Sequence, residues 1–170
     1  MDELIILVDE KDNQIGTGEK LIVHKEGKLH RCFSIFVFNS KEEIMLQRRA
    51  KSKYHSGGLW TNTCCSHPRA GEENEEAAHR RLTEEMGFDC GLKEIFTFSY
   101  KAQLDQGLTE NEFDHVFIGY YDGDPKINPE EADEWKWVSM NDLDEDIKNY
   151  PEKYTVWSLI AFEKIKDYLK

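Results

Sequence analysis

The sequence predicts an α+β fold in which mixed β-sheets pack with helices in a sandwich. Two observations point to this class. Short runs of β-branched and aromatic residues are interrupted, and then followed, by stretches with helix caps and helical spacing. In addition, residues 34–38 (Ser-Ile-Phe-Val-Phe) are almost continuously apolar, which is typical of a strand covered on both faces.

Six strands are expected. Each is a short run rich in β-branched or aromatic residues, and each is bounded by turn or charged residues. They lie at residues 4–8, 32–38, 44–47, 95–100, 113–121 and 135–138.

The clearest helix is predicted over residues 74–86. Asn74 is the candidate N-cap, because its side chain can accept a hydrogen bond from a free backbone N–H. Glu75 and Glu76 suit the positive end of the helix dipole, and Gly87 supplies the stop.

Two further helices are expected near the C-terminus. Ser139 followed by Asp142 resembles a capping box, which predicts a short helix to about Lys148. The last helix is predicted over residues 151–169, where large and small apolar residues recur at helical spacing. These residues are Tyr154, Trp157, Ala161 and Ile165.

The composition limits the functions that the chain can have. At 170 residues without repeats or a Pro/Gly-rich linker, residues 1–170 are expected to form one domain. The net charge of −12 argues against nucleic acid or an anionic membrane as a partner, although a small anionic ligand remains possible. No apolar run is long enough for a membrane span, and the acidic N-terminus fits no targeting peptide. We therefore expect a cytoplasmic protein, with a monomer as the default.

The four cysteines do not form a disulfide framework. They show no paired spacing, and the sequence has no secretory signal, so reduced thiols are expected. A structural zinc site is the weaker option, because neither Cys64 nor Cys65 has a second thiol at zinc-finger spacing. Cys32 and Cys90 are interpreted as small buried residues.

Three histidines are candidate metal ligands. His24 and His30 lead into the strand expected at 32–38, and His67 lies within the run WTNTCCSHP at 60–68. Pro68 indicates that this run is a loop, so the neighbouring Cys65 lies on an irregular segment where reactive side chains concentrate. For each histidine taken alone, a polar loop residue without a ligand is the alternative.

Two glutamates are the second group of candidate ligands. Glu110 and Glu112 lead directly into the strand expected at 113–121. If the strand has already begun, their side chains point to the same face, where two carboxylates repel unless a cation or a proton holds them. An exposed acidic strand edge is the alternative. Together with the histidines they form a five-ligand set that suits Mn²⁺, Mg²⁺ or Zn²⁺.

The segment 72–88 contains a third signal. Its pattern of Glu, two Arg, two Glu and Gly resembles the Nudix box, a loop and helix whose glutamates hold magnesium against a diphosphate. Two positions depart from that box: Ser66 stands where it begins with glycine, and Arg81 replaces a glutamate. A solvated face of i,i+4 ion pairs is the alternative interpretation of this helix.

Taken together, these motifs resemble the type I isopentenyl-diphosphate delta-isomerase family. The resemblance covers about residues 20–157 and rests on Trp60-Thr61-Asn62-x-x-Cys65-x-His67-Pro68, Glu110-Asn111-Glu112 and the altered Nudix box. It implies the Nudix fold and the interconversion of isopentenyl and dimethylallyl diphosphates.

The resemblance also implies roles for individual residues. The ligands of one divalent ion (Mn²⁺, Mg²⁺ or Zn²⁺) would be His24, His30, His67, Glu110 and Glu112. Glu85 would bind a second ion, Mg²⁺, that arrives with the substrate diphosphate. The cationic residues that grip this diphosphate would be Lys20, Arg49 and Lys53. Cys65 and Glu112 would form the acid–base pair, Tyr100 would be bonded to the glutamate, and Trp157 would face the hydrocarbon part.

The chemistry of a double-bond shift agrees with these roles. A proton must be added to one carbon and another removed from a neighbour, through a tertiary carbocation that water would quench. A tryptophan face stabilises such a cation by about 2 kcal/mol when desolvated. A nearby metal and histidine would stabilise the Cys65 thiolate. For Trp157, a place in the hydrophobic core is the alternative.

Two other functions remain open at this stage. A Nudix hydrolase acting on a nucleoside diphosphate derivative is one, but Arg81 removes a carboxylate that such an enzyme uses. A non-catalytic metal- or ligand-binding module is the other, and it gives Cys65 no task.

Overall fold

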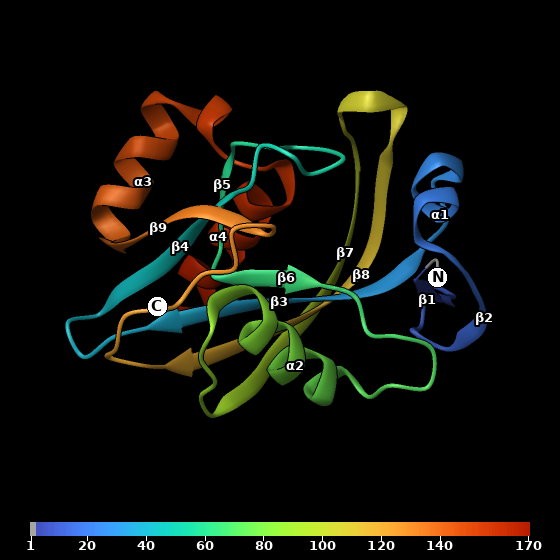
Figure 1. The fold of residues 1–170 in the computed structure, drawn as a ribbon, viewed down its shortest axis with the longest axis horizontal. Helices are drawn as coiled ribbons and strands as arrows, with labels where there is room; N and C mark the ends of the chain where they lie inside the picture. Colours follow the sequence, from blue (N-terminus) through green and yellow to red (C-terminus); the bar gives the residue numbers. More distant parts are fainter. Residues whose placement is uncertain (1–2) are drawn as a thin grey trace.

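The computed structural model describes residues 3–170. Within this range nine strands are joined by hydrogen bonds into a mixed sheet, and helices cover both of its faces (Figure 1). The α+β class expected from the sequence is confirmed. No helix in this range is long and apolar enough to cross a membrane.

The elements follow one another in a simple order. They are β1 (Leu4–Val8), β2 (Gln14–Glu19), α1 (Lys20–Glu26), β3 (His30–Phe38), β4 (Glu43–Arg49), β5 (Trp60–Thr61), β6 (Cys64–Ser66), α2 (Asn74–Met86), β7 (Leu92–Gln103), the 3₁₀ turn η1 (Asp105–Gly107), β8 (Thr109–Tyr120), β9 (Ala132–Ser139), α3 (Met140–Asn149), the 3₁₀ turn η2 (Pro151–Lys153) and α4 (Val156–Leu169).

Strand β3 is the centre of the sheet. It runs parallel to β8 over its whole length, and this register places His30 beside Glu112. It also pairs antiparallel with β6, where Ser34 faces Cys65. Three segments that lie far apart in the sequence therefore meet at one place in the sheet.

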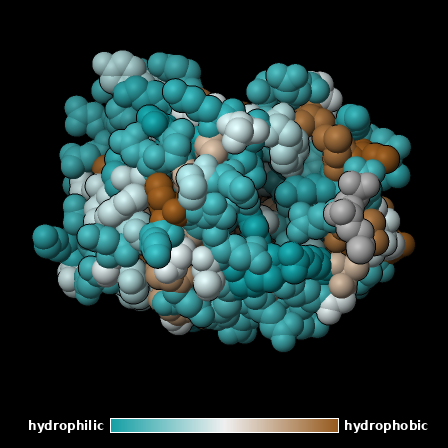
Figure 2. Space-filling view, in the orientation of Figure 1, coloured by the Kyte–Doolittle hydropathy of each residue, from teal (hydrophilic) through white to brown (hydrophobic). Residues whose placement is uncertain are grey.

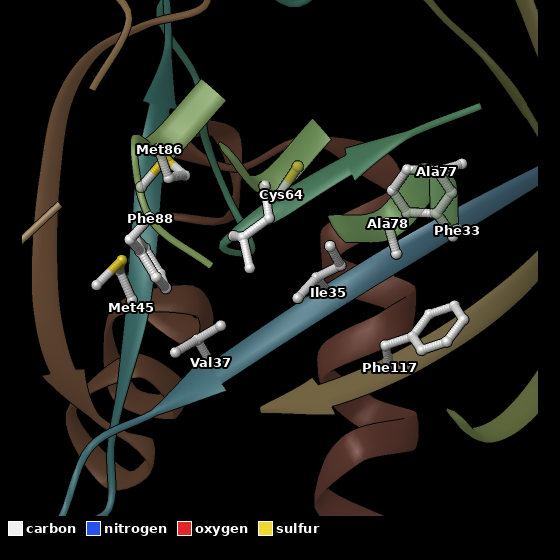
Figure 3. Close-up of a cluster of buried hydrophobic side chains, with 11 residues drawn as sticks. Phe33, Ile35, Val37, Met45, Cys64, Ala77, Ala78, Met86, Phe88 and Phe117 are labelled. Atoms are coloured by element: carbon white, nitrogen blue, oxygen red, sulfur yellow. The ribbon is translucent and has the colours of Figure 1, made fainter. Parts of the chain in front are cut away.

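The alternation of side chains along β3 creates two hydrophobic cores. Odd-numbered residues such as Phe33 and Ile35 pack against α2, together with Phe117 of β8 (Figure 3). Even-numbered residues such as Phe36 pack on the other face against Phe162 of α4. The near-continuous apolar run is thus covered on both faces, as its composition predicted.

Helix α2 has the predicted bounds but not the predicted cap. Glu73 is the N-cap and makes no side-chain cap hydrogen bond. Asn74 is the first helical residue instead, and its Oδ1 atom is buried with no hydrogen-bond partner within residues 3–170. The stop is confirmed: Gly87 has a φ of 70°, and a Cβ atom there would lie 2.2 Å from the carbonyl oxygen of Lys126.

The C-terminal helices agree in part with the prediction. Ser139 Oγ accepts a hydrogen bond from the Asp142 N–H, which confirms it as the N-cap of α3. A single helix over residues 151–169 is wrong, because η2 ends before Tyr154 and α4 begins at Val156. Tyr154 instead forms a β-bridge with Trp60, and Thr155 then caps α4.

Several elements were not expected from the sequence. These are β2, α1, β5, β6 and the two 3₁₀ turns. The surface in Figure 2 is mainly hydrophilic, and one of its hydrophobic areas lies over α1 and β2, where Ile15, Leu21 and Ile22 are exposed. Because α1 turns apolar side chains outward, its sequence lacks the stripe by which a buried helix is recognised.

Candidate active site

One pocket gathers nearly all of the residues singled out in the sequence. It contains about 490 Å³ of space free of protein atoms, its open mouth included. Ten of the predicted site residues line it: Lys20, Arg49, Lys53, Cys65, His67, Glu85, Tyr100, Glu110, Glu112 and Trp157. The other two, His24 and His30, are fully buried behind Glu110 and Glu112.

Local structure explains how the buried polar cluster is assembled. His24 lies in the last turn of α1, and Gly27, with a φ of 65°, ends that helix so that the chain can enter β3 at His30. Glu110 and Glu112 are both inside β8, which begins earlier than predicted, so their side chains share one face.

The cluster brings nitrogen and oxygen atoms within the reach of one ion. Ligand atoms of His24, His30, His67 and Glu110 all lie within 4.8 Å of one another. Glu112 joins them, since its Oε2 atom is 3.0 Å from His67 Nε2 and 3.4 Å from His30 Nε2. The structure therefore brings together all five residues of the predicted ligand set.

The tautomers of two histidines are fixed by backbone carbonyls. His24 Nδ1 is 2.6 Å from the carbonyl oxygen of Lys20, and His30 Nδ1 is 2.8 Å from that of Lys28. In the neutral form of each ring the proton is therefore on Nδ1, and Nε2 presents a lone pair to the cluster.

The Nε2 atoms of both histidines lie close to carboxylate oxygens, which are also hydrogen-bond acceptors. His24 Nε2 lies 3.3 Å from Glu110 Oε1, and both His24 Nε2 and His30 Nε2 are buried with no hydrogen-bond donor among the residues that the structure describes. Glu110 Oε2 is likewise buried and unpartnered. Converging acceptors without a donor are costly to bury, whereas a divalent cation would satisfy all of them. The donor set thus fits a bound divalent metal.

The two carboxyl groups have pKa values displaced in opposite directions. Burial, together with the neighbouring Glu112 charge, raises the pKa of Glu110. Burial also acts to raise the pKa of Glu112, but hydrogen bonding, including the bond with His67 Nε2 at 3.0 Å, outweighs it and lowers the value. Two crowded carboxylates repel each other unless a cation or a proton holds them, and the opposite shifts express this repulsion.

A tyrosine completes the surroundings of Glu112. The Tyr100 hydroxyl, on the neighbouring strand β7, donates a hydrogen bond to Glu112 Oε1. Both oxygens of this carboxylate are therefore engaged, one by Tyr100 and the other by His67. The contact expected between Tyr100 and the glutamate is present.

The thiol of Cys65 lines the same pocket. Cys65 is in β6, a short strand where the sequence predicted an irregular loop. Trp157, at the start of α4, donates its Nε1–H to Cys65 Sγ over 3.0 Å. Burial raises the pKa of this thiol, and Arg49 opposes the effect only in part. These surroundings by themselves favour the thiol, and the thiolate expected beside a metal and a histidine stays a prediction.

Three cationic side chains also line the pocket. The Arg49 guanidinium lies 5.1 Å from the ring centroid of Trp157. Lys53 Nζ is 2.8 Å from Glu131, and Lys20 Nζ is 3.6 Å from Glu3. Three positive charges beside one cavity create a place for a small anion in an otherwise acidic protein.

Glu85 is held at the same end of the pocket. Gln47 donates to its Oε2 atom over 2.8 Å, and Arg81 donates to its Oε1 atom over 2.6 Å. Arg81 also contacts Glu84 and Glu131. The arginine that replaces the Nudix-box glutamate is therefore an ion-pair partner of the remaining carboxylates.

Sequence reasoning missed several residues of the pocket. Tyr54 and His55 line it from the loop between β4 and β5, and Arg81 lines it from α2. Cys32 is buried as expected, but it also lines the pocket. Nothing in the spacing of His55 marks it, because only the tertiary position of its loop brings it to Glu110.

Comparisons with known proteins agree with the fold and the motifs. The NUDIX domain model matches residues 28–158. Isopentenyl-diphosphate Delta-isomerase 2 of Aromatoleum aromaticum is 54% identical over 97% of this chain and 87% of its own. Isopentenyl-diphosphate Delta-isomerase 2 of Photorhabdus laumondii is 55% identical over 97% and 91%, respectively.

Solved structures show the same fold at lower identity. A protein of Deinococcus radiodurans superposes with a TM-score of 0.74 at 23% identity, covering 86% of this chain and 90% of its own. A MutT protein of Methanosarcina mazei gives 0.67 at 21% identity, covering 84% and 96%. The Nudix fold expected from the sequence is therefore confirmed.

Proposed function

Because the chain belongs to the isopentenyl-diphosphate Delta-isomerases of the NUDIX superfamily, we propose that it interconverts isopentenyl diphosphate and dimethylallyl diphosphate. This reaction is a step of isoprenoid biosynthesis. The observation that carries the proposal is the meeting of Cys65, Glu112 and Trp157 in one pocket beside a cationic end. A thiol in that position has a task in proton transfer and none in simple diphosphate binding.

The reaction moves a proton without net oxidation. One carbon of the substrate gains a proton, a neighbouring carbon loses one, and the double bond shifts between them. Cys65 and Glu112 are the proposed acid–base pair, and each such group contributes about 10²–10⁴-fold to the rate. Tyr100 holds one oxygen of Glu112 in place, which supports a fixed direction for its proton.

The five-residue cluster is the proposed site of a divalent ion. His24, His30, His67, Glu110 and Glu112 would hold it, and Mn²⁺, Mg²⁺ and Zn²⁺ all suit this mixture of imidazole and carboxylate. When bound, such an ion withdraws electron density from the Glu112 carboxyl group and so strengthens it as an acid. The support is the set of buried acceptors that have no donor.

The diphosphate is assigned to the cationic end. Lys20, Arg49 and Lys53 would donate charge-assisted hydrogen bonds to its oxygens. Glu85 would hold a second ion, Mg²⁺, which enters with the diphosphate and is typically bound by one or two carboxylates and phosphate oxygens. The present partners of the two lysines, Glu3 and Glu131, would then have to share them with the substrate.

The hydrocarbon part is assigned to the end of the pocket where Trp157 contacts Cys65, with Arg49 5.1 Å from the indole ring. The positive charge that develops on the tertiary carbon would lie over the indole face. The Trp157 side chain is buried, with 4% of its surface exposed. A desolvated cation–π contact is worth about 2 kcal/mol. Exclusion of water from this end prevents capture of the carbocation.

An assay of both possible reactions tests the proposal. Incubation with isopentenyl diphosphate and Mg²⁺, followed by ¹H and ³¹P NMR, should show dimethylallyl diphosphate and no release of phosphate or pyrophosphate. A His79→Gln variant, altered on the exposed face of α2, is the matched control and should behave as wild type. Release of phosphate without isomerisation would support a Nudix hydrolase instead.

A further inference from the structure

A fourth histidine lies against the proposed metal site. His55, in the loop between β4 and β5, is 4% exposed and lines the pocket. Its Nε2 atom is 3.6 Å from Glu110 Oε1, the same oxygen that faces His24 Nε2 at 3.3 Å. Its ring is roughly stacked with that of His24, with centroids 6.1 Å apart.

His55 differs from the other histidines in the proton that it can offer. His24 and His30 have Nδ1–H groups bonded to backbone carbonyls, so their Nε2 atoms cannot donate. His55 Nδ1 is 3.1 Å from the Ser56 hydroxyl, which can itself donate to Nδ1. The Nε2–H tautomer of His55 is then satisfied on one side and directed at Glu110 on the other.

We propose that His55 is a positioning residue, whose Nε2–H donates to Glu110 Oε1 and thereby directs the Glu110 carboxylate toward the metal. The inference rests on the proposed function, because it assumes that this cluster binds an ion. The present separation is about 0.5 Å beyond a hydrogen bond, and such contacts often tighten only when the site is filled. Ligating carboxylates are commonly oriented by hydrogen bonds of this kind.

The loop that carries His55 is held in place independently of the ion. The Ser56 N–H donates to Asp105 in η1 over 3.0 Å, and Arg49 donates to the His55 carbonyl oxygen over 3.2 Å. Ser56 has a φ of 51°, a conformation that non-glycine residues rarely adopt. Figure 1 shows this loop reaching from β4 toward the β7–β8 hairpin. A strained and tethered residue beside His55 agrees with a fixed ring.

The same ring also contacts the proposed hydrocarbon end. His55 and Trp157 meet edge to face, with ring centroids 5.5 Å apart and an interplanar angle of 84°. A substitution could therefore act through lost packing on Trp157, not through Glu110. The two effects separate if one variant keeps an aromatic ring without a donor and another keeps a donor without the ring.

Metal binding is the readout that distinguishes these effects. Purified protein is stripped with a chelator and titrated with Mn²⁺ alone, with free Mn²⁺ followed by EPR, and each variant is checked for folding by its thermal transition. His55→Phe keeps the ring but loses the donor, and its Kd for Mn²⁺ should rise about tenfold, the lower end for such partners. His55→Gln places an amide N–H near the Nε2 position and should restore most of the affinity. His79→Gln serves as the surface control.

The outcomes are distinct. A wild-type Kd for folded His55→Phe would overturn the inference, while wild-type protein that binds no Mn²⁺ would overturn it together with the proposed metal site. If His55→Phe does not fold, Ser56→Gly keeps the positive φ and removes the hydroxyl that faces Nδ1. That variant should weaken Mn²⁺ binding in the same direction, and unchanged affinity would contradict the proposal.

Discussion

Substitution of Trp157 separates its two proposed contributions to the reaction. The indole N–H donates to Cys65 Sγ over 3.0 Å, and the ring face is assigned to the carbocation. Trp157→Phe removes the donor and keeps an aromatic face. A hydrogen bond to a charged acceptor is worth about 1.5–3 kcal/mol. If the sulfur carries negative charge at the transition state, kcat should therefore fall about 10- to 150-fold.

Trp157→Leu removes the ring face as well. The lost cation–π contact of about 2 kcal/mol should lower kcat by roughly a further 30-fold. The assay is the initial rate of isomerisation by ¹H NMR at saturating substrate, together with the thermal midpoint of each variant. Trp137→Leu is the matched control, since Trp137 packs against the core on the α2 side of the sheet. Equal rates for Trp157→Phe and Trp157→Leu would refute the role of the ring face, and a wild-type rate for Trp157→Phe would refute that of the donor.

Three other perturbations follow from the contacts described above. Tyr100→Phe removes the hydroxyl bonded to Glu112 Oε1 and should lower kcat about tenfold or more, measured at saturating substrate; an unchanged rate would contradict a fixed Glu112. Burial alone would raise the pKa of Glu131, but Lys53 and Arg81 lower it to about 2. The ionised Glu131 therefore stabilises the fold at pH values above its ordinary pKa of 4.5, and this stabilisation is lost as the pH falls toward 2. The difference in urea midpoint between wild type and Glu131→Gln should accordingly shrink over that interval, and a constant difference would count against the pairing. Ser139→Ala removes the N-cap of α3 and should lower the free energy of unfolding by about 1 kcal/mol in urea titration, with normal isomerisation; no loss of stability would show that the cap is dispensable.

The parts of the fold that could be predicted are those whose side chains alone determine the structure. The bounds of α2 followed from the acidic residues of its first turn, Glu75 and Glu76, and from Gly87, which has a positive φ. Strand β2 was missed because QIGTGE has no apolar alternation and is formed by pairing with β1. Helix α4 was placed too early because the bridge between Tyr154 and Trp60 is a tertiary contact that no local pattern contains.

In the candidate site, too, some residues could be predicted from the sequence and others could not. The three histidines and two glutamates of the ligand set could be named from the sequence, and β3 and β8 bring His30 and Glu112 together by parallel pairing. The Asn74 cap was wrong because the chain enters α2 one residue earlier, at Glu73. His55 could not be found, since its loop reaches Glu110 only after the sheet has formed.

The central claim is that Cys65 and Glu112 together exchange protons with the substrate. The most direct test incubates the enzyme with isopentenyl diphosphate and Mg²⁺ in D₂O and follows deuterium in the product's methyl group by NMR. Wild-type protein should incorporate deuterium, while folded Cys65→Ala and Glu112→Gln should both fail to do so. Near-normal turnover and incorporation by Cys65→Ala would contradict the two-residue account.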